Sequence, residues 1–199
     1  MSQNHQVLAR ARQFRFHNAL VRNGHGSLNE ISSDKDFFDE AKGSKKLVVH
    51  FYRNTTLRCK ILDEHLKVLA KQHIETKFLK LDVDKCDWIV GKLNIRIIPT
   101  MALILDGKTT GYLRGFEEFG GSDDFSTEML EWRLGTAGII TYKGDLKTPP
   151  DQRKGLQQGK TSKIERSNQN EARGGCDDDF DTDEEIANWW KKWGESSTK

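Results

Sequence analysis

The feature that most constrains the fold of this chain is its order of sequence patterns: strand-like and helix-like segments alternate, and a hairpin follows them. Residues 47–52 (LVVHFY) form a continuous apolar run typical of a buried strand, and residues 61–69 then carry apolar side chains at the 3.6-residue period of a helix. Asp106-Gly107-Lys108 is a hairpin turn between two later strand-like runs. The predicted order is helix 34–41, strand 47–52, helix 61–69, strand 78–83, helix 88–93, strand 100–105, strand 109–114 and helix 129–134. This order predicts an α/β domain with a mixed sheet of about four strands and helices on both faces.

The order of elements resembles the thioredoxin fold, and three motifs strengthen the resemblance. Residues 50–66 (HFYRNTTLRCKILDEHL) resemble the strand, loop and helix that carry the Cys-x-x-Cys dithiol of thioredoxin. Ile98-Pro99-Thr100 resembles the segment that holds thioredoxin's cis-proline, and Asp106-Gly107-Lys108 matches its hairpin. Because all three occur in the thioredoxin order, we expect a thioredoxin-like α/β domain.

The dithiol position of this expected domain has lost one of its two cysteines. Its four residues are Thr56-Leu57-Arg58-Cys59, so a hydroxyl stands in the attacking position and Cys59 in the resolving position. A dithiol cycle needs one thiol to attack the substrate disulfide and a second to resolve the mixed disulfide. His50 also stands where thioredoxin has a buried acid that aids proton transfer. We therefore expect no catalytic residues and interpret Thr56, Cys59 and Pro99 as a degenerate redox site in a binding protein.

One enzymatic alternative uses the remaining thiol. Thr-x-x-Cys is also the core of the peroxiredoxin motif, in which the threonine orders a peroxide and the cysteine attacks it. Peroxiredoxins carry a proline four residues before that threonine, and here the position is Tyr52. The alternative hypothesis is therefore a thiol peroxidase or another monothiol redox protein that uses Cys59.

Charge and cysteine content argue against several other classes of protein. The formal net charge is +2, which gives no basis for bulk nucleic-acid binding, and no apolar run approaches the roughly 18 residues needed to span a bilayer. Three cysteines at unrelated spacings fit a reducing compartment, and the histidines lack paired metal spacing. We predict no metal and no cofactor. The acid-free, arginine-bearing start also resembles a mitochondrial presequence, so organellar import is the minor alternative to a cytoplasmic location.

Composition divides the chain into four segments. Residues 1–23 form a basic arm, with a helix predicted over residues 7–22, and the thioredoxin-like domain follows over 24–142. Residues 143–176 contain Pro149-Pro150 and few large aliphatic residues, which is typical of a disordered linker. An acidic tail, residues 177–199, ends the chain.

The tail contains a pattern typical of a docking helix. Residues 182–194 (TDEEIANWWKKWG) begin with a capping box, Thr182-x-x-Glu185, and end at Gly194. Four apolar residues follow the i, i+3, i+4, i+7 spacing of one stripe: Ile186, Trp189, Trp190 and Trp193. Because so short a helix is marginal alone in water, the stripe is predicted either to dock on a partner or to fold back on its own domain.

Several short segments over residues 24–140 carry a resemblance that goes beyond the fold. These segments are Gly24-His25-Gly26, Glu30-Ile31, Asp36-Phe37-Phe38, His50-Phe51-Tyr52-Arg53, Cys59-Lys60-Ile61-Leu62-Asp63, Gly115-Phe116 and Asp123-Asp124-Phe125. Together they resemble the phosducin-like family. The resemblance implies a non-catalytic co-chaperone that binds the cytosolic chaperonin and modulates its ATPase and its folding of actin and tubulin. It implies a cytoplasmic location, with the nucleus and the centrosome as further sites. Family members carry a long charged helical region before this domain, whereas here the preceding 23 residues are basic.

Overall fold

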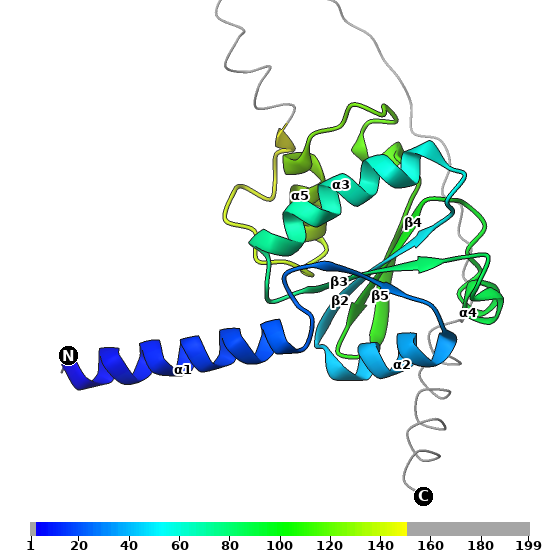
Figure 1. Cartoon of the computed structure of the whole chain (residues 1–199). Helices are drawn as coiled ribbons and strands as arrows, with labels where there is room; N and C mark the ends of the chain where they lie inside the picture. The colour runs from blue at the N-terminus through cyan, green and yellow to red at the C-terminus, as the bar shows by residue number, and fades with distance from the viewer. Residues whose placement is uncertain (1–2, 151–199) are drawn as a thin grey trace, which may run out of the picture. The chain divides into compact units, whose positions relative to one another are not determined.

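The computed structural model describes residues 3–150 of the chain (Figure 1). The described residues up to Leu146 form one compact unit, which contains every described helix and strand. The predicted linker beyond residue 150 and the predicted tryptophan helix, with Ile186, Trp189, Trp190 and Trp193, lie outside the described residues.

A five-stranded mixed sheet forms the centre of the domain, in the order β1-β3-β2-β4-β5. The strands β1, β2 and β3 are parallel, whereas β4 pairs antiparallel with β2 and β5 antiparallel with β4. The strands are β1 (Leu28–Ile31), β2 (Lys46–Tyr52), β3 (Lys77–Asp82), β4 (Thr100–Leu105) and β5 (Lys108–Arg114). The predicted thioredoxin-like α/β fold is confirmed.

The sheet has one strand more than the sequence predicted. The additional strand, β1, is only four residues long, lies at an edge and pairs only with β3. Its sequence LNEI is too short for a periodic pattern to distinguish it from a loop. The pairing of Leu28 with Phe78, fifty positions later in the chain, is what makes this segment a strand.

Helices cover both faces of the central strands. The helices are α1 (Gln3–Arg22), α2 (Asp34–Gly43), α3 (Leu57–Gln72), α4 (Asp87–Lys92) and α5 (Thr127–Thr136), with a short 3₁₀ helix η1 (Glu117–Phe119) before α5. Serine side chains cap two of them, because the Ser33 hydroxyl accepts a bond from the Asp36 N–H and Ser126 does the same for the Met129 N–H. The predicted helix over residues 7–22 is part of α1.

Burial on β2 explains why the sheet needs helices on both sides. Six consecutive residues of β2 are buried, and alternate side chains of a strand point to opposite faces. Val48 belongs to a cluster with Leu62 and Leu66 of α3 and Leu130 and Leu134 of α5, so these two helices cover one face. His50, two residues after Val48, points to that same face.

The spacing of Trp88 and Trp132 on the predicted helices 88–93 and 129–134 predicts that both are packing residues. The structure packs Trp132 against the core and leaves Trp88 exposed. Trp132 of α5 packs against the core, and its indole N–H donates to the main-chain oxygen of Leu146. Trp88 of α4 is 42% exposed, and its ring packs edge-to-face with that of Phe38. The prediction for Trp88 was wrong because α4 has only six residues, too few for helical spacing to define a buried face.

Candidate functional site

The end of β2 and the start of α3 build the candidate site. The chain leaves β2 after Tyr52, and Thr56 is the residue immediately before α3. The N–H of Cys59 bonds the main-chain oxygen of Thr56 at 3.2 Å, which places Cys59 in the first turn of the helix. The Thr56 side chain makes no capping bond to the helix; its hydroxyl instead bonds the Cys59 thiol. The structure therefore brings Thr56 and Cys59 into direct contact.

Cys59 is a poor nucleophile in this setting. Its side chain is buried, and this burial raises the pKa of the thiol above its usual value. The negative charge of Asp63, one helical turn later, also raises it, while hydrogen bonds from the Arg53 backbone and the Thr56 hydroxyl act in the opposite direction. Because the thiolate is the reactive form, a buried thiol with a raised pKa is mostly unreactive near neutral pH.

Pro99 lies beside this loop in the sheet. The Ile98–Pro99 peptide bond is cis, and Thr100 at the start of β4 pairs with Phe51 near the end of β2. Pro99 is buried, and its main-chain oxygen accepts a bond from the Gly115 N–H at 2.8 Å. Thr56, Cys59 and Pro99 thus lie near the same end of the central strands, where β2 ends and β4 begins.

A buried histidine–aspartate pair lies beneath the site. His50 is fully buried, and its Nδ1–H donates to Asp63 Oδ1 at 2.8 Å, because a carboxylate can only accept. Its other ring nitrogen, Nε2, has no hydrogen-bond partner. Asp63 follows Cys59 by four residues on α3, so both side chains face the sheet. A buried polar group thus occupies the position at which the sequence resemblance aligned His50 with the buried acid of thioredoxin.

Two further charged residues extend this pair across the sheet. His50 pairs with Lys80 of β3, and Lys80 pairs with Glu30 of β1, so the three side chains stand in one row on one face. The Lys80 ammonium lies 3.1 Å from a Glu30 carboxylate oxygen and 4.0 Å from Asp63 Oδ2. Sequence analysis missed Glu30, Asp63 and Lys80. The Cys59/Asp63 spacing was a usable signal, but the row itself depends on strand register.

The surface around the site carries exposed apolar side chains. Leu57, the first residue of α3, is 67% exposed, and Ile97, two residues before Pro99, is 52% exposed. Next to them, Arg58 forms a 2.8 Å ion pair with Asp123 and lies over the ring of Phe116. This surface has the mixture of aliphatic and arginine side chains that is common at protein interfaces.

Two other kinds of site are not found among residues 3–150. No group of three histidine, cysteine, aspartate or glutamate side chains in this range could hold a metal ion. Within the same range, no helix combines the length and the apolar character needed to cross a bilayer.

Comparison with known proteins adds a second line of evidence. The sequence profile of the family described as Thioredoxin matches residues 29–121. The chain is 57% identical over 129 residues to thioredoxin domain-containing protein 9 of Mus musculus. The aligned region covers 65% of this chain and 57% of the mouse protein. The chain is 51% identical over 147 residues to the Homo sapiens protein of the same name, covering 74% and 64% of the two chains.

A relative with a different name is similar to nearly the same degree. Phosducin-like protein 3 of Drosophila melanogaster is 50% identical over 131 residues, which covers 66% of this chain and 61% of that protein. The chain thus spans less than two thirds of the length of each of these three relatives.

Proposed function

Because this chain contains a thioredoxin-like domain and is closely related over it to proteins named thioredoxin domain-containing protein 9 and phosducin-like protein 3, we propose that it is a non-catalytic co-chaperone. In this proposal it binds the cytosolic chaperonin, modulates its ATPase, and influences the folding of actin and tubulin in the cytoplasm. The chaperonin and its clients come from the resemblance to the phosducin-like family.

The observation that carries the non-catalytic part is the chemistry of the Thr56/Cys59 pair. A hydroxyl occupies the attacking position of the dithiol, and the remaining thiol is buried with a raised pKa. Cys86, the other cysteine among the described residues, is also buried, and burial raises its pKa to about 11. Neither thiol is suited to begin disulfide exchange, but the thioredoxin-like domain still presents a surface on which a partner could bind.

The binding part of the proposal uses the exposed surface around the degenerate site. Leu57 and Ile97 would place aliphatic side chains against the partner, with Arg58 beside them. Removing two apolar contacts from the centre of an interface typically costs at least about 2 kcal/mol in binding, or more than tenfold in affinity. This surface is therefore the first place to perturb.

The test measures capture of purified cytosolic chaperonin by the full chain at physiological salt, and the ATPase rate of the complex. We expect capture and a changed rate, at least tenfold weaker binding for the double variant Leu57→Asp/Ile97→Asp, and little change for Val68→Asp. Val68 is a matched control because it is 44% exposed and lies on the same helix as Leu57. Absence of chaperonin from the captured material would reject the proposal, and equal loss in all variants would reject this surface.

The competing hypothesis, a monothiol peroxidase that uses Cys59, predicts a different result. The hydrogen bond from Thr56 to the thiol is the one feature that favours it, and burial opposes it. Peroxide consumption and insulin reduction by the purified chain are compared with those of Cys59→Ser. Activity that disappears with this substitution would establish the enzyme, and equal background rates would eliminate it.

The predicted tail helix has its own test. Deletion of residues 177–199 leaves the described domain complete. Reduced affinity for the partner with an unchanged melting temperature would support docking of Ile186, Trp189, Trp190 and Trp193 on the partner. A lower melting temperature with unchanged affinity would reject it.

A further inference from the structure

The helix α1 exposes apolar side chains that find no cover in the described domain. Val7, Phe14 and Phe16 are 65%, 66% and 64% exposed, and Val21 is 49% exposed. Most of the stability of a helix in a protein comes from packing of its apolar face against another surface, which these side chains lack in the described domain. The exposed side chains are therefore available for an intermolecular contact.

One face of α1 carries the spacing of a coiled coil. Val7, Ala11, Phe14, Asn18 and Val21 follow one another at intervals of four, three, four and three residues. Side chains at this alternation form one seam along a helix, which suits packing against a second helix. A polar asparagine within such a seam favours a particular register and a small number of strands.

The charges that flank this seam select the partner. Three arginines, Arg10, Arg15 and Arg22, occupy flanking positions, and no acidic residue occurs before Glu30. Two copies of α1 would bring like charges together, whereas an acidic helix would pair with them. We propose that α1 is a docking helix for an acidic amphipathic helix of a partner protein.

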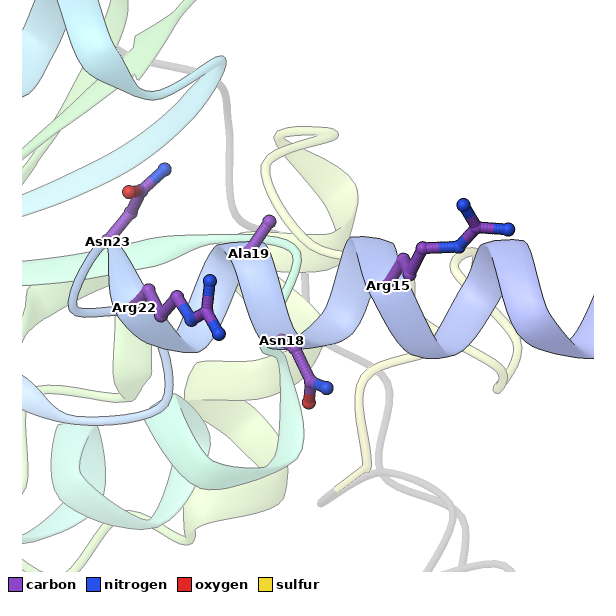
Figure 2. Close-up of a pocket in the computed structure, with 5 residues that line it drawn as sticks. All are labelled: Arg15, Asn18, Ala19, Arg22 and Asn23. Carbon is purple, nitrogen blue, oxygen red and sulfur yellow. The ribbon is translucent and has the colours of Figure 1, made fainter.

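A hollow on the same helix fits this partner. It has a volume of about 280 Å³ and is lined by Arg15, Asn18, Ala19, Arg22 and Asn23, all from α1 or the residue that follows it (Figure 2). The first four lie at i, i+3, i+4 and i+7; Asn18 belongs to the seam and Arg15 and Arg22 flank it, so the hollow borders one side of the seam. The small Ala19 leaves space between its longer neighbours, and the positive charge of Arg15 and Arg22 favours a carboxylate beside it.

The C-terminal end of α1 is anchored to the domain. The buried ammonium of Lys77 bonds the Glu40 carboxylate and the main-chain oxygen of Asn23. His25 bonds the main-chain oxygen of Ile74 at 2.7 Å. Because these bonds fix the residues directly after α1, a partner held by the helix is also tethered to the domain.

A membrane surface fits the same helix less well. A helix that lies in a bilayer interface gathers its large apolar side chains on one face. Phe14 and Phe16 are two positions apart and so lie on roughly opposite sides of α1, yet both are exposed. A bilayer interface would require both side chains in one broad apolar face, whereas a facing helix covers only the narrower seam that contains Phe14 and leaves Phe16 outside it.

The test titrates the isotope-labelled full chain with a designed four-heptad peptide that has aliphatic residues in its seam and glutamate at both flanking positions. The like charges keep this peptide monomeric. We expect saturable changes in the NMR signals of residues 7–22, and at least tenfold weaker binding of an otherwise identical peptide with lysine in place of glutamate. Binding should also weaken as salt is added.

Variants of α1 separate this interaction from general charge attraction. Arg15→Glu/Arg22→Glu should weaken binding of the glutamate peptide at least tenfold, and Ala19→Leu should weaken it by filling the hollow without changing charge. The control Lys60→Glu/Lys108→Glu makes the same change in charge at two exposed positions of the domain and should bind within twofold of the unaltered chain. Equal binding of both peptides, equal loss in the control, self-association through α1, or binding only to phosphatidylserine vesicles would each overturn the proposal.

Discussion

Truncation of Asp63 removes the only hydrogen-bond partner of a fully buried histidine, which makes it a sharp test of the reasoning about the site. The Nδ1–H of His50 donates to Asp63 Oδ1 at 2.8 Å, and the Nε2 atom of the same ring already has no partner. In Asp63→Ala both ring nitrogens are therefore buried without a hydrogen bond. Leaving one buried donor unsatisfied costs about 1–3 kcal/mol. We expect the free energy of unfolding to fall by about 2 kcal/mol.

Two matched variants identify the cause of that loss. Asp63→Asn keeps an oxygen that can accept from His50, so its cost should be about 1 kcal/mol or less. Asp39→Ala removes an exposed carboxylate from α2 and should change stability by no more than about 0.5 kcal/mol. If Asp63→Ala costs no more than Asp39→Ala, the buried pair contributes nothing and the argument is refuted.

Urea denaturation followed by circular dichroism gives the free energies, and thermal melting gives a second measurement. For a unit of about 150 residues, 2 kcal/mol corresponds to a fall in melting temperature of roughly 4–8 °C. The slope of the urea transition should stay constant across the series, since the substitutions change stability and not the surface exposed on unfolding.

The same substitutions report on the thiol. The charge of Asp63 is among the causes that raise the pKa of Cys59, after burial. Asp63→Asn removes this charge and should lower the pKa of Cys59, so alkylation of that thiol by iodoacetamide at neutral pH should become faster. An unchanged or slower alkylation rate in a folded Asp63→Asn chain would contradict this account.

Two further predictions concern other parts of the domain. Burial lowers the pKa of His25 below the ordinary value of 6.5. The contribution of His25 to stability is therefore complete above pH 6.5 and is lost as the pH falls from about 6.5 toward the pKa of the folded state. His25→Gln should flatten the dependence of stability on pH between pH 7 and pH 5, measured by urea denaturation, and an unchanged dependence would contradict the assignment. Gly135→Ala should destabilise the domain by roughly 1–3 kcal/mol, because the added methyl would lie 2.5 Å from the Cβ of Tyr142. The added methyl of Gly91→Ala in α4 meets no atom within 4 Å, so this variant should be more stable by up to about 1 kcal/mol. Similar melting temperatures for the two variants would show that the clash at Gly135 is relieved.

The sequence was sufficient for the features that depend on local pattern. The fold followed from the strand period of residues 47–52, the helical period of residues 61–69 and the hairpin at Gly107. The spacing of Thr56 and Cys59 correctly placed both residues at the start of a helix, whereas their interpretation as a degenerate redox site stays a prediction. Each of these signals lies within a short segment, where side-chain periodicity and turn chemistry act directly on the backbone.

Features that depend on long-range register could not be predicted. Glu30, Lys80 and His50 share a row only because three strands from distant parts of the chain align in parallel. The burial of His50 against Asp63 follows from the packing of α3 over that row. Trp88 shows the converse, since its apolar character predicted burial and the short helix α4 leaves it at the surface.

The edge position of β1 has a practical consequence for any attempt to shorten this protein. Its four residues pair with residues 78–81 of β3, which has no other strand on that side among the described residues. A chain cut before Leu28 keeps that pairing, whereas a chain cut at Asp34 leaves an open, largely apolar strand ready to pair with a neighbouring molecule. A chain that lacks only α1 should therefore remain soluble. A chain that begins at Asp34, and so lacks residues 28–33 as well, should aggregate.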